Sequence, residues 1–359
     1  GDYYRRYTTD MYTASVALPA VYGTGSPKGN NAEMKTDGWE LSLSWRDSFK
    51  LGGKPFDYSI KAMVWDSKSV ITKYVNDTGS LGTVKGFIEN GGSPSSYYVG
   101  MTVGEIWGYT VAGLFRDQAD IDSSAIHDFV QASDKVTRPG QVKIADLDGN
   151  GFIDPGNFAV DDHGDLRIIG NQSPRYRYGV NLSARWNGIG LSVFLQGVGA
   201  RDWYPGSDAG MFWGKYGRPF FALIPSIHNY TDDMYSAERN NWDTAYWPRM
   251  TTYQSNGTKN WTRLLEIPNT RYIQSAAYLR VKNIQLDYSF PKHICSAIRL
   301  QGLKIYVNAE NLFTFTPLHK YAPNFDPEGL SYDSDFASAA DGYTYPILKS
   351  VTVGVNITF

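Results

Sequence analysis

The chain closes on a run whose alternation decides the fold class: Ser350-Val351-Thr352-Val353-Gly354-Val355-Asn356-Ile357-Thr358-Phe359. Apolar side chains at every second position lie on one face of an extended strand, and the polar and small residues between them lie on the other. An amphipathic helix would need a period of about 3.6 residues, which this run does not have. The stretch therefore predicts an amphipathic β-strand.

The same period of two recurs along the chain. It predicts strands at 39–45, 56–64, 176–186, 191–195, 279–290 and 303–309. The dipeptide Asn187-Gly188 is a strong signal for a hairpin turn, and a change of parity predicts a β-bulge near Asn283. Weaker strand candidates lie at 3–8, 108–115 and 220–224, and residues 123–132 form a short surface helix at most. The predicted fold class is all-β.

The connections between these strands fall into two sizes. The turns at 52–55, 187–190 and 291–302 are short, whereas the segments at about 66–175 and 198–276 are long. Outer-membrane barrels combine short periplasmic turns with long extracellular loops. The polar face also carries charged residues that suit a water-filled lumen better than a dry core, namely Arg177, Arg185, Lys304 and Glu310. An antiparallel transmembrane β-barrel is therefore predicted.

Composition excludes several other classes of protein. No apolar run is long enough for a transmembrane helix, and the mean hydropathy is −0.38. With 34 basic and 36 acidic residues the chain has no basic excess, which excludes a nucleic-acid partner. The 26 Tyr, 17 Phe and 10 Trp residues are typical of a barrel with aromatic girdles.

Residues suited to catalysis are sparse. Cys295 is the one cysteine, so neither an intrachain disulfide nor a cysteine-based metal site can form. The five histidines lack metal-ligand spacing, and no Gly-x-Ser-x-Gly elbow occurs. A protein without enzymatic activity is expected.

Several stretches, in order along the chain, carry a family resemblance. They are DGWELSL at 37–43, GY at 108–109 with GLF at 113–115, KIADLDGNGFID at 143–154, IIG at 168–170 with YG at 178–179, YLRVKN at 278–283, NAENLFT at 308–314, DPE at 326–328 and VGVNITF at 353–359. Each is weak alone, but together they are specific. The chain resembles the SusC-like (RagA/SusC) group of TonB-dependent outer-membrane transporters of Bacteroidetes.

The resemblance implies a particular organisation. Members of this group have a plug domain and a barrel of about 22 strands, a size that holds a plugged lumen. Residues 1–359 would then be the carboxyl-terminal portion of one such barrel, completed by an amino-terminal barrel and plug segment absent from this chain, since strand edges cannot stay open in lipid. A small self-contained barrel is the rival interpretation. The implied partners are a SusD-like surface lipoprotein, the TonB complex, outer-membrane lipid and, in a dimer of transporter pairs, a second copy.

A loop beginning at Asp146 has the oxygen spacing of an EF-hand-type calcium loop. Its expected ligands are Asp146, Asp148, Asn150, Phe152 through its carbonyl, and Asp154. Asn157 stands where the standard loop has a bidentate carboxylate, so Asp161, Asp162 or Asp165 would have to replace it. Calcium in the loop at 146–157 is one interpretation, and a loop that caps itself through Asx turns is the other.

Aromatic residues crowd the second long segment. Those that could contact a substrate or a lipoprotein lid are Trp203, Tyr204, Trp213, Trp242 and Trp247. Flat aromatic faces beside polar groups suit sugar rings, but aromatics at interfaces need no ligand, and the alternative is a loop folded on itself or on its partner. Phe359, a terminal aromatic on an amphipathic strand, resembles the signal read by the outer-membrane assembly machinery.

These observations predict an integral protein of the bacterial outer membrane. Its expected function is TonB-dependent active import of oligomeric nutrients together with a SusD-like lipoprotein. By resemblance the substrates are oligosaccharides or oligopeptides, and the aromatic loop tilts the expectation towards glycans. No cofactor is required. The alternatives are a secreted carbohydrate-binding β-sandwich and a passive porin.

Overall fold

The computed structural model describes most of the chain. The described residues are 1–14, 21, 23, 27–76, 79–81, 97–126, 137–205, 212, 233–249, 268–330 and 347–359.

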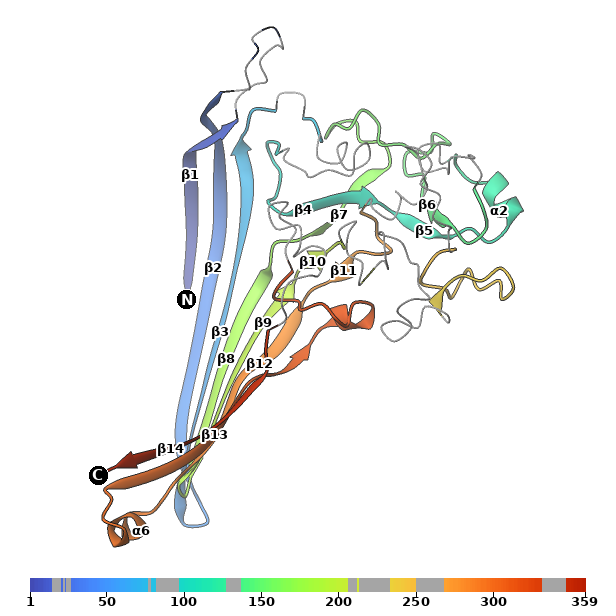
Figure 1. Cartoon of the computed structure of the whole chain (residues 1–359). Helices are drawn as coiled ribbons and strands as arrows, with labels where there is room; N and C mark the ends of the chain where they lie inside the picture. Colours follow the sequence, from blue (N-terminus) through green and yellow to red (C-terminus); the bar gives the residue numbers. More distant parts are fainter. Residues whose placement is uncertain are drawn as a thin grey trace.

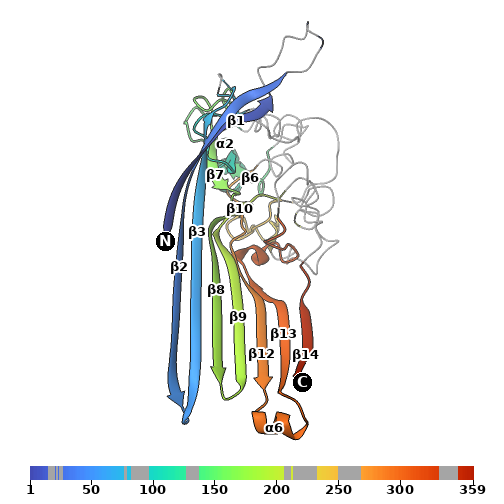
Figure 2. The ribbon, with the colours of Figure 1, turned by 90° about the vertical axis from the view of Figure 1, so that its left-hand side faces the viewer.

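One large antiparallel sheet dominates the molecule (Figure 1). Its strands in spatial order are β1 (Asp2–Ala14), β2 (Lys28–Leu51), β3 (Lys54–Lys73), β8 (Arg175–Trp186), β9 (Ile189–Ala200), β12 (Tyr278–Ser289), β13 (Gly302–Phe315) and β14 (Ser350–Thr358). Figure 2 shows β1 and β14 at opposite edges. The predicted all-β class is confirmed, and among the described residues no second large sheet packs on this one, which argues against the sandwich alternative.

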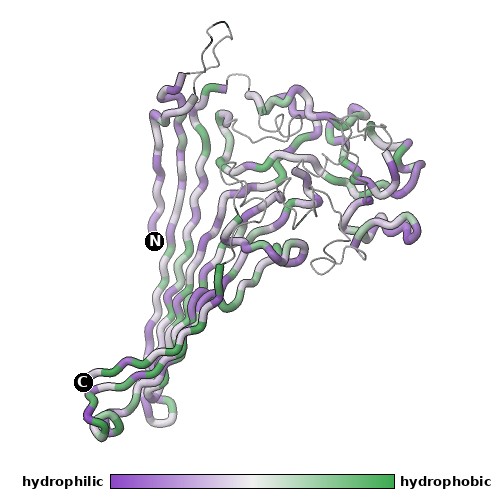
Figure 3. Tube along the Cα trace, viewed as in Figure 1, coloured by the Kyte–Doolittle hydropathy of each residue, from purple (hydrophilic) through white to green (hydrophobic). Residues whose placement is uncertain are grey.

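The two faces of this sheet have opposite chemistry. At one level the register aligns an apolar row across seven strands: Trp45, Ile60, Leu182, Val193, Ile284, Ala309 and Val351. One residue further on, a polar row faces the other way: Arg46, Ser59, Ser183, Ser192, Gln285, Asn308 and Thr352. Figure 3 shows the resulting alternation of apolar and polar residues along the strands. Such alternation is typical of a barrel wall between lipid and water.

The observed strands differ from the predicted ones in instructive ways. The bulge is confirmed, because the register on both sides of β12 shifts between Val281 and Asn283. The candidate at 3–8 is β1, a full strand of the main sheet. The candidate at 108–115 is split into β4 (Glu105–Tyr109) and β5 (Val111–Leu114), which belong to two small sheets. The candidate at 220–224 lies outside the described residues.

Two further expectations concern a helix and the first long connection. Residues 123–126 of the helix candidate at 123–132 are not helical, and its remaining residues lie outside the described part of the chain. The helix α2 (Gln118–Asp122) precedes them and begins after Asp117, whose carboxylate accepts from the amide of Asp120. The first long connection begins only after Lys73, because β3 continues past residue 66.

The long connections fold together at the end of the sheet opposite the tight turns (Figure 1). Here β4 pairs with β7 (Leu166–Asn171), β5 with β6 (Val142–Ile144), and β10 (Asp202–Trp203) with β11 (Gln274–Ser275). Their shared apolar core includes Tyr109, Leu114, Leu166 and Tyr272. We call this part of the chain the loop region. The turn between β12 and β13 carries α6 (Lys292–Ala297), and η3 (Pro317–Lys320) follows β13.

Among the described residues, no helix is long and apolar enough to cross a membrane.

Candidate functional site

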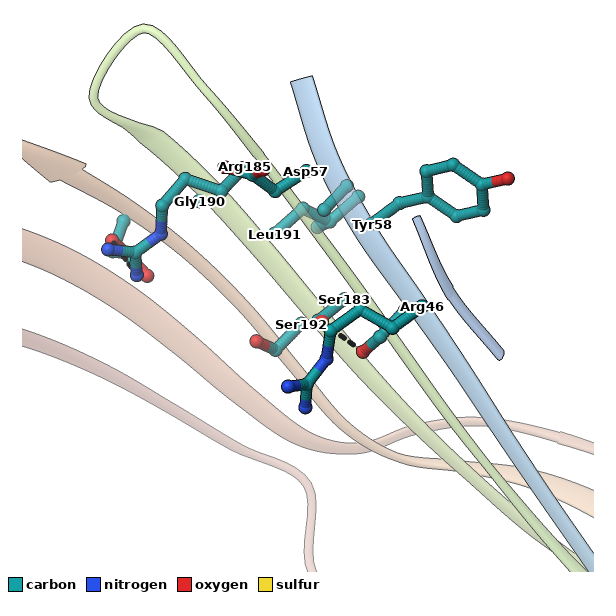
Figure 4. Close-up of a pocket in the computed structure, with 11 residues that line it drawn as sticks. Arg46, Asp57, Tyr58, Ser183, Arg185, Gly190, Leu191 and Ser192 are labelled. Carbon is teal, nitrogen blue, oxygen red and sulfur yellow. Dashed lines mark hydrogen bonds and ion pairs between the residues drawn. The ribbon is translucent and has the colours of Figure 1, made fainter. Parts of the chain in front are cut away.

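The inward face of the sheet carries a polar pocket of about 270 Å³ near the tight turns. Figure 4 shows Arg46, Ser183, Arg185 and Ser192 along it, with Tyr58 directed to the other side of the sheet. The hydroxyls of Ser59 and Ser183 lie 2.8 Å apart and form a hydrogen bond. The pocket therefore offers cationic, anionic and hydroxyl groups on one wall.

Asp287 on β12 is the most buried charged group of this pocket, at 5% exposed. Gly190 faces it from β9, and a Cβ at Gly190 would lie 2.8 Å from both carboxylate oxygens, so glycine makes the space that the carboxylate occupies. Lys304 Nζ lies 3.3 Å from Oδ1, and Arg185 Nη2 lies 4.0 Å from Oδ2. Asp287 is thus held between two cations in the inward wall.

A second polar pocket continues the wall towards β14. It is lined by Asn283, Gln285, Lys304, Tyr306, Asn308, Thr352 and Asn356. The Asn283 amide donates to Asn308 Oδ1 at 2.8 Å. Lys304 belongs to this pocket and also contacts Asp287, so the two pockets form one polar strip. Such a strip can bind polar oligomers through hydrogen bonds and charges of both signs.

Arg280 fastens the DPE stretch at 326–328 to the top of β12. Its guanidinium is 4% exposed and contacts Asp326 Oδ1 at 2.6 Å, Glu328, and Thr314 Oγ1 at 2.9 Å. Arg201, at the end of β9, donates to the carbonyls of Pro327 and Leu330. Two arginines therefore hold the segment after η3 against the sheet.

The loop beginning at Asp146 brings three carboxylates together. One oxygen each from Asp146, Asp148 and Asp165 lies within 4.8 Å of the others. Oxygens bound to one calcium ion at about 2.4 Å can be at most about 4.8 Å apart. Of the three candidates for the missing carboxylate, Asp165 is the one that joins the cluster.

The other expected ligands satisfy their hydrogen bonds within the loop. Asn150 Nδ2 donates to Asp154 at 2.9 Å, and Asn150 Oδ1 accepts from the Phe152 amide at 2.7 Å. Asp146 accepts from the amides of Gly149 and Gly151. This pattern of short-range bonds is that of a self-capping loop, so the calcium interpretation rests on the three carboxylates.

The environments of two carboxyls pull their pKa values in opposite directions. Hydrogen bonds from backbone amides, first that of Gly151, lower the pKa of Asp146 below its ordinary 3.8. Asp146 thus adds stability above that pH, and the contribution is lost as the pH falls through the lowered pKa. Burial, followed by the charges of Asp148 and Asp146, raises the pKa of Asp165.

The raised pKa of Asp165 has the reverse consequence. At neutral pH the ionised Asp165 lowers the stability of the folded chain, because the folded environment favours the protonated carboxyl. Asp165 is fully buried beside two other acids. A divalent cation among the three carboxylates would offset this cost, so the donor set fits calcium.

The predicted contact aromatics lie in the core of the loop region. Trp203, Tyr204 and Trp247 are between 0% and 2% exposed. Trp242 is half-buried and packs against the same core, and Trp213 lies outside the described residues. For the three buried rings this burial favours the alternative that the loop folds on itself.

We expect Trp247→Ala to destabilise the loop region by about 3–5 kcal/mol, because truncating a buried tryptophan leaves a cavity. Trp247 is 1% exposed and packs on Tyr246 and Tyr272. Trp242→Ala should cost about 1 kcal/mol. Hydrogen exchange of the loop region in the two variants measures both values, and equal protection would contradict the burial account.

Known proteins share this architecture. No protein-family model matches the chain. Two TonB-dependent receptors of Formosa agariphila, P3 and P26, are 25% and 22% identical to it, and each match covers 100% of this chain and 32% of the relative. The resemblance to TonB-dependent transporters is confirmed. The chain therefore spans about a third of the length of the curated relatives it matches.

Solved structures share the fold. The RagAB peptide transporter aligns with this chain at a TM-score of 0.60 and 17% identity, and the alignment covers 99% of this chain and 33% of the transporter chain. The RagAB peptide importer in its open-open state has a TM-score of 0.61 and 18% identity, covering 99% and 32%. These likenesses confirm that the main sheet has the fold of part of such a transporter, and the outer-membrane location agrees with the TonB-dependent receptors among the relatives. The named relatives are receptors and transporters.

Phe359 lies just beyond β14 and is 83% exposed. Its role as an assembly signal stays a prediction.

Proposed function

We propose that the protein to which this chain belongs imports oligomeric nutrients actively across the outer membrane, in a TonB-dependent manner and without enzymatic activity. The observation that carries the proposal is the pairing of an apolar outer row with a polar inner row across the same strands. A wall of this kind separates lipid from a hydrated path. The similarity to TonB-dependent receptors supports an energised mechanism.

We infer that the chain supplies the carboxyl-terminal wall of a larger barrel. A plug segment and further strands would complete it, because an open sheet edge in lipid leaves backbone groups unpaired at a cost of several kcal/mol each. The likeness to the RagAB peptide transporter supports a SusD-like lipoprotein as the lid here. A dimer of transporter pairs remains part of the proposal.

Oligopeptides are the substrate class that we propose first, and oligosaccharides are the competing class. The expectation of glycans depends on exposed aromatic residues, but Trp203, Tyr204 and Trp247 are buried. The inner wall instead presents Arg46, Asp287 and several amides. Charges of both signs and amide hydrogen bonds suit peptides, and the named structural neighbours are peptide importers.

The test is uptake by cells that carry the full-length transporter or lack it. Labelled oligopeptides and labelled oligosaccharides are supplied separately, and internal label is measured with and without an uncoupler. The proposal predicts transporter-dependent accumulation of one class that stops when the proton-motive force is dissipated. Accumulation that continues after uncoupling would indicate a passive porin and overturn active import.

We further propose that calcium binds between Asp146, Asp148 and Asp165 and holds the loop region together. Removing calcium with a chelator is expected to destabilise the loop region by about 2.7 kcal/mol, if the ion is normally present at a hundredfold excess over its Kd. Thermal unfolding with and without chelator measures this loss, and added calcium should restore the melting temperature.

The control for calcium is Asp165→Asn, which keeps the shape of the side chain and removes its charge. The chelator should have little effect on the melting temperature of this variant. If the chelator leaves the wild-type melting temperature unchanged, the self-capping interpretation of the loop is correct.

A further inference from the structure

The outward face of the sheet changes from mostly apolar to charged near the extracellular end of β1 to β3. Below this point the outward residues of β2 include the apolar Leu41, Leu43 and Trp45, and Asp47 is the one charged outward residue between Trp39 and Phe49. Above it, the same face carries Arg5 on β1, Lys35 and Asp37 on β2, and Lys68 on β3, which we call the outer cation cluster. The register places Arg5 and Lys68 on either side of Asp37.

The depth of the outer cation cluster follows from strand geometry. Phe49 and Trp39 mark two exposed aromatic levels on the outward face of β2. They are about 33 Å apart along the strand, and a tilt of about 40° reduces this to about 25 Å, the height of the apolar band of an outer-membrane barrel. Asp37 and Lys35 follow Trp39 on the same face and lie about 5–10 Å above it. That is the depth of the lipid headgroups.

The outer cation cluster has an excess of positive charge. Asp37 pairs with two cations: its Oδ1 lies 2.5 Å from Arg5 Nε and its Oδ2 lies 3.0 Å from Lys35 Nζ. Lys68 is the register partner of Asp37 on β3. The side chains of Arg5 and Lys35 are 47% and 31% exposed. Three cations therefore lie beside one carboxylate in the register of β1 to β3, and the side chains of Arg5 and Lys35 are partly exposed. The next outward carboxylate of β3, Asp66, has its own cation in Arg175.

Aromatic side chains flank the outer cation cluster. Tyr3 and Tyr7 lie on the same outward face of β1 and are 66% and 63% exposed. Tyrosine and tryptophan are favoured where a membrane protein passes from acyl chains to headgroups. The surface thus combines an interfacial belt with cations just above it.

We propose that the outer cation cluster binds the phosphate groups of phosphorylated glycolipids in the outer leaflet. Lysine and arginine near an anionic membrane surface each strengthen binding by about fivefold, and Arg5 can present a planar fork to a phosphate. The proposal rests on the outer-membrane location and is independent of import. It gives this part of the wall a specific lipid neighbour in addition to generic bilayer contact.

The test uses the full-length transporter purified in mild detergent and titrated with lipid A, with bound lipid counted by native mass spectrometry. Lys68→Gln should weaken lipid A binding about fivefold, and Lys35→Gln with Lys68→Gln about 25-fold. Lys61→Gln is the matched control, because Lys61 lies on the same strand with inward parity. It should leave the affinity unchanged.

Two further measurements separate recognition of a lipid phosphate from binding of acyl chains alone or of free phosphate. Lipid A stripped of its phosphates should bind no better to the wild type than intact lipid A binds to the double variant. Inorganic phosphate at the concentration of the lipid should not displace it, because the acyl chains also contact the outward face. Equal lipid A affinity for wild type and double variant, or full displacement by inorganic phosphate, would overturn the proposal.

Discussion

Replacing Arg280 with methionine is expected to destabilise the attachment of residues 317–330 by about 3–5 kcal/mol, the usual effect of removing one partner from a buried ion pair. Arg280 is the cation between Asp326 and Glu328, and its side chain is 4% exposed. Methionine keeps the apolar stem of the side chain but removes the guanidinium and leaves both carboxylates without this partner. Hydrogen exchange of residues 317–330 measures the loss of protection.

The matched control for Arg280→Met is Lys282→Met. Lys282 pairs with Glu328 at 2.8 Å, but its side chain is 20% exposed. A partly exposed pair contributes about 1 kcal/mol or less. Exchange rates that rise equally in the two variants would show that burial of Arg280 is not what holds the segment.

Gly197→Ala is expected to reduce assembly of the sheet severely, with a cost of about 3 kcal/mol from overpacking. A Cβ at Gly197 would lie 2.3 Å from the Tyr278 carbonyl oxygen and 2.4 Å from the Tyr178 ring. The Tyr178 hydroxyl also donates to that carbonyl at 3.1 Å, and the added methyl group would displace it. The fraction of full-length protein that resists unfolding in detergent at room temperature measures assembly.

Gly302→Ala is the control for this prediction. Gly302 lies in β13, and a Cβ there would meet its nearest atoms at 3.5 Å, an ordinary contact distance. This variant should assemble like the wild type. If both alanine variants assemble equally well, the tyrosine packed over Gly197 is not needed for the pairing of β8, β9 and β12.

The sequence alone predicted the two faces of the main sheet, because a period of two is visible wherever one face meets lipid and the other meets water. The bulge at Asn283 was predictable for the same reason. The upper half of β2 was not, because residues 28–38 are largely polar on both faces and show no alternation. The strand continues there because β1 and β3 pair with it.

The candidate site was harder to predict, because it depends on residues that are distant in sequence. Asp165 joins Asp146 and Asp148 only through the fold of the loop region. A buried Trp247 and a Trp247 exposed for sugar binding give the same amino-acid composition, so the aromatic content of the sequence could not distinguish a core residue from a contact residue. The sequence marks Arg185 and Lys304 as lumen residues, but it does not bring Asp287 and Gly190 beside them, because these residues lie on different strands.

The main sheet is expected to be a membrane wall, with lipid on one face and water on the other. Single spin labels placed along 350–358 of the full-length protein, with Cys295→Ser, test it in native-like bilayers. Accessibility to oxygen should peak at Val351, Val353 and Val355, and accessibility to a water-soluble nickel complex should peak at Thr352 and Asn356. Equal accessibility of neighbouring positions to both reagents would contradict the barrel wall.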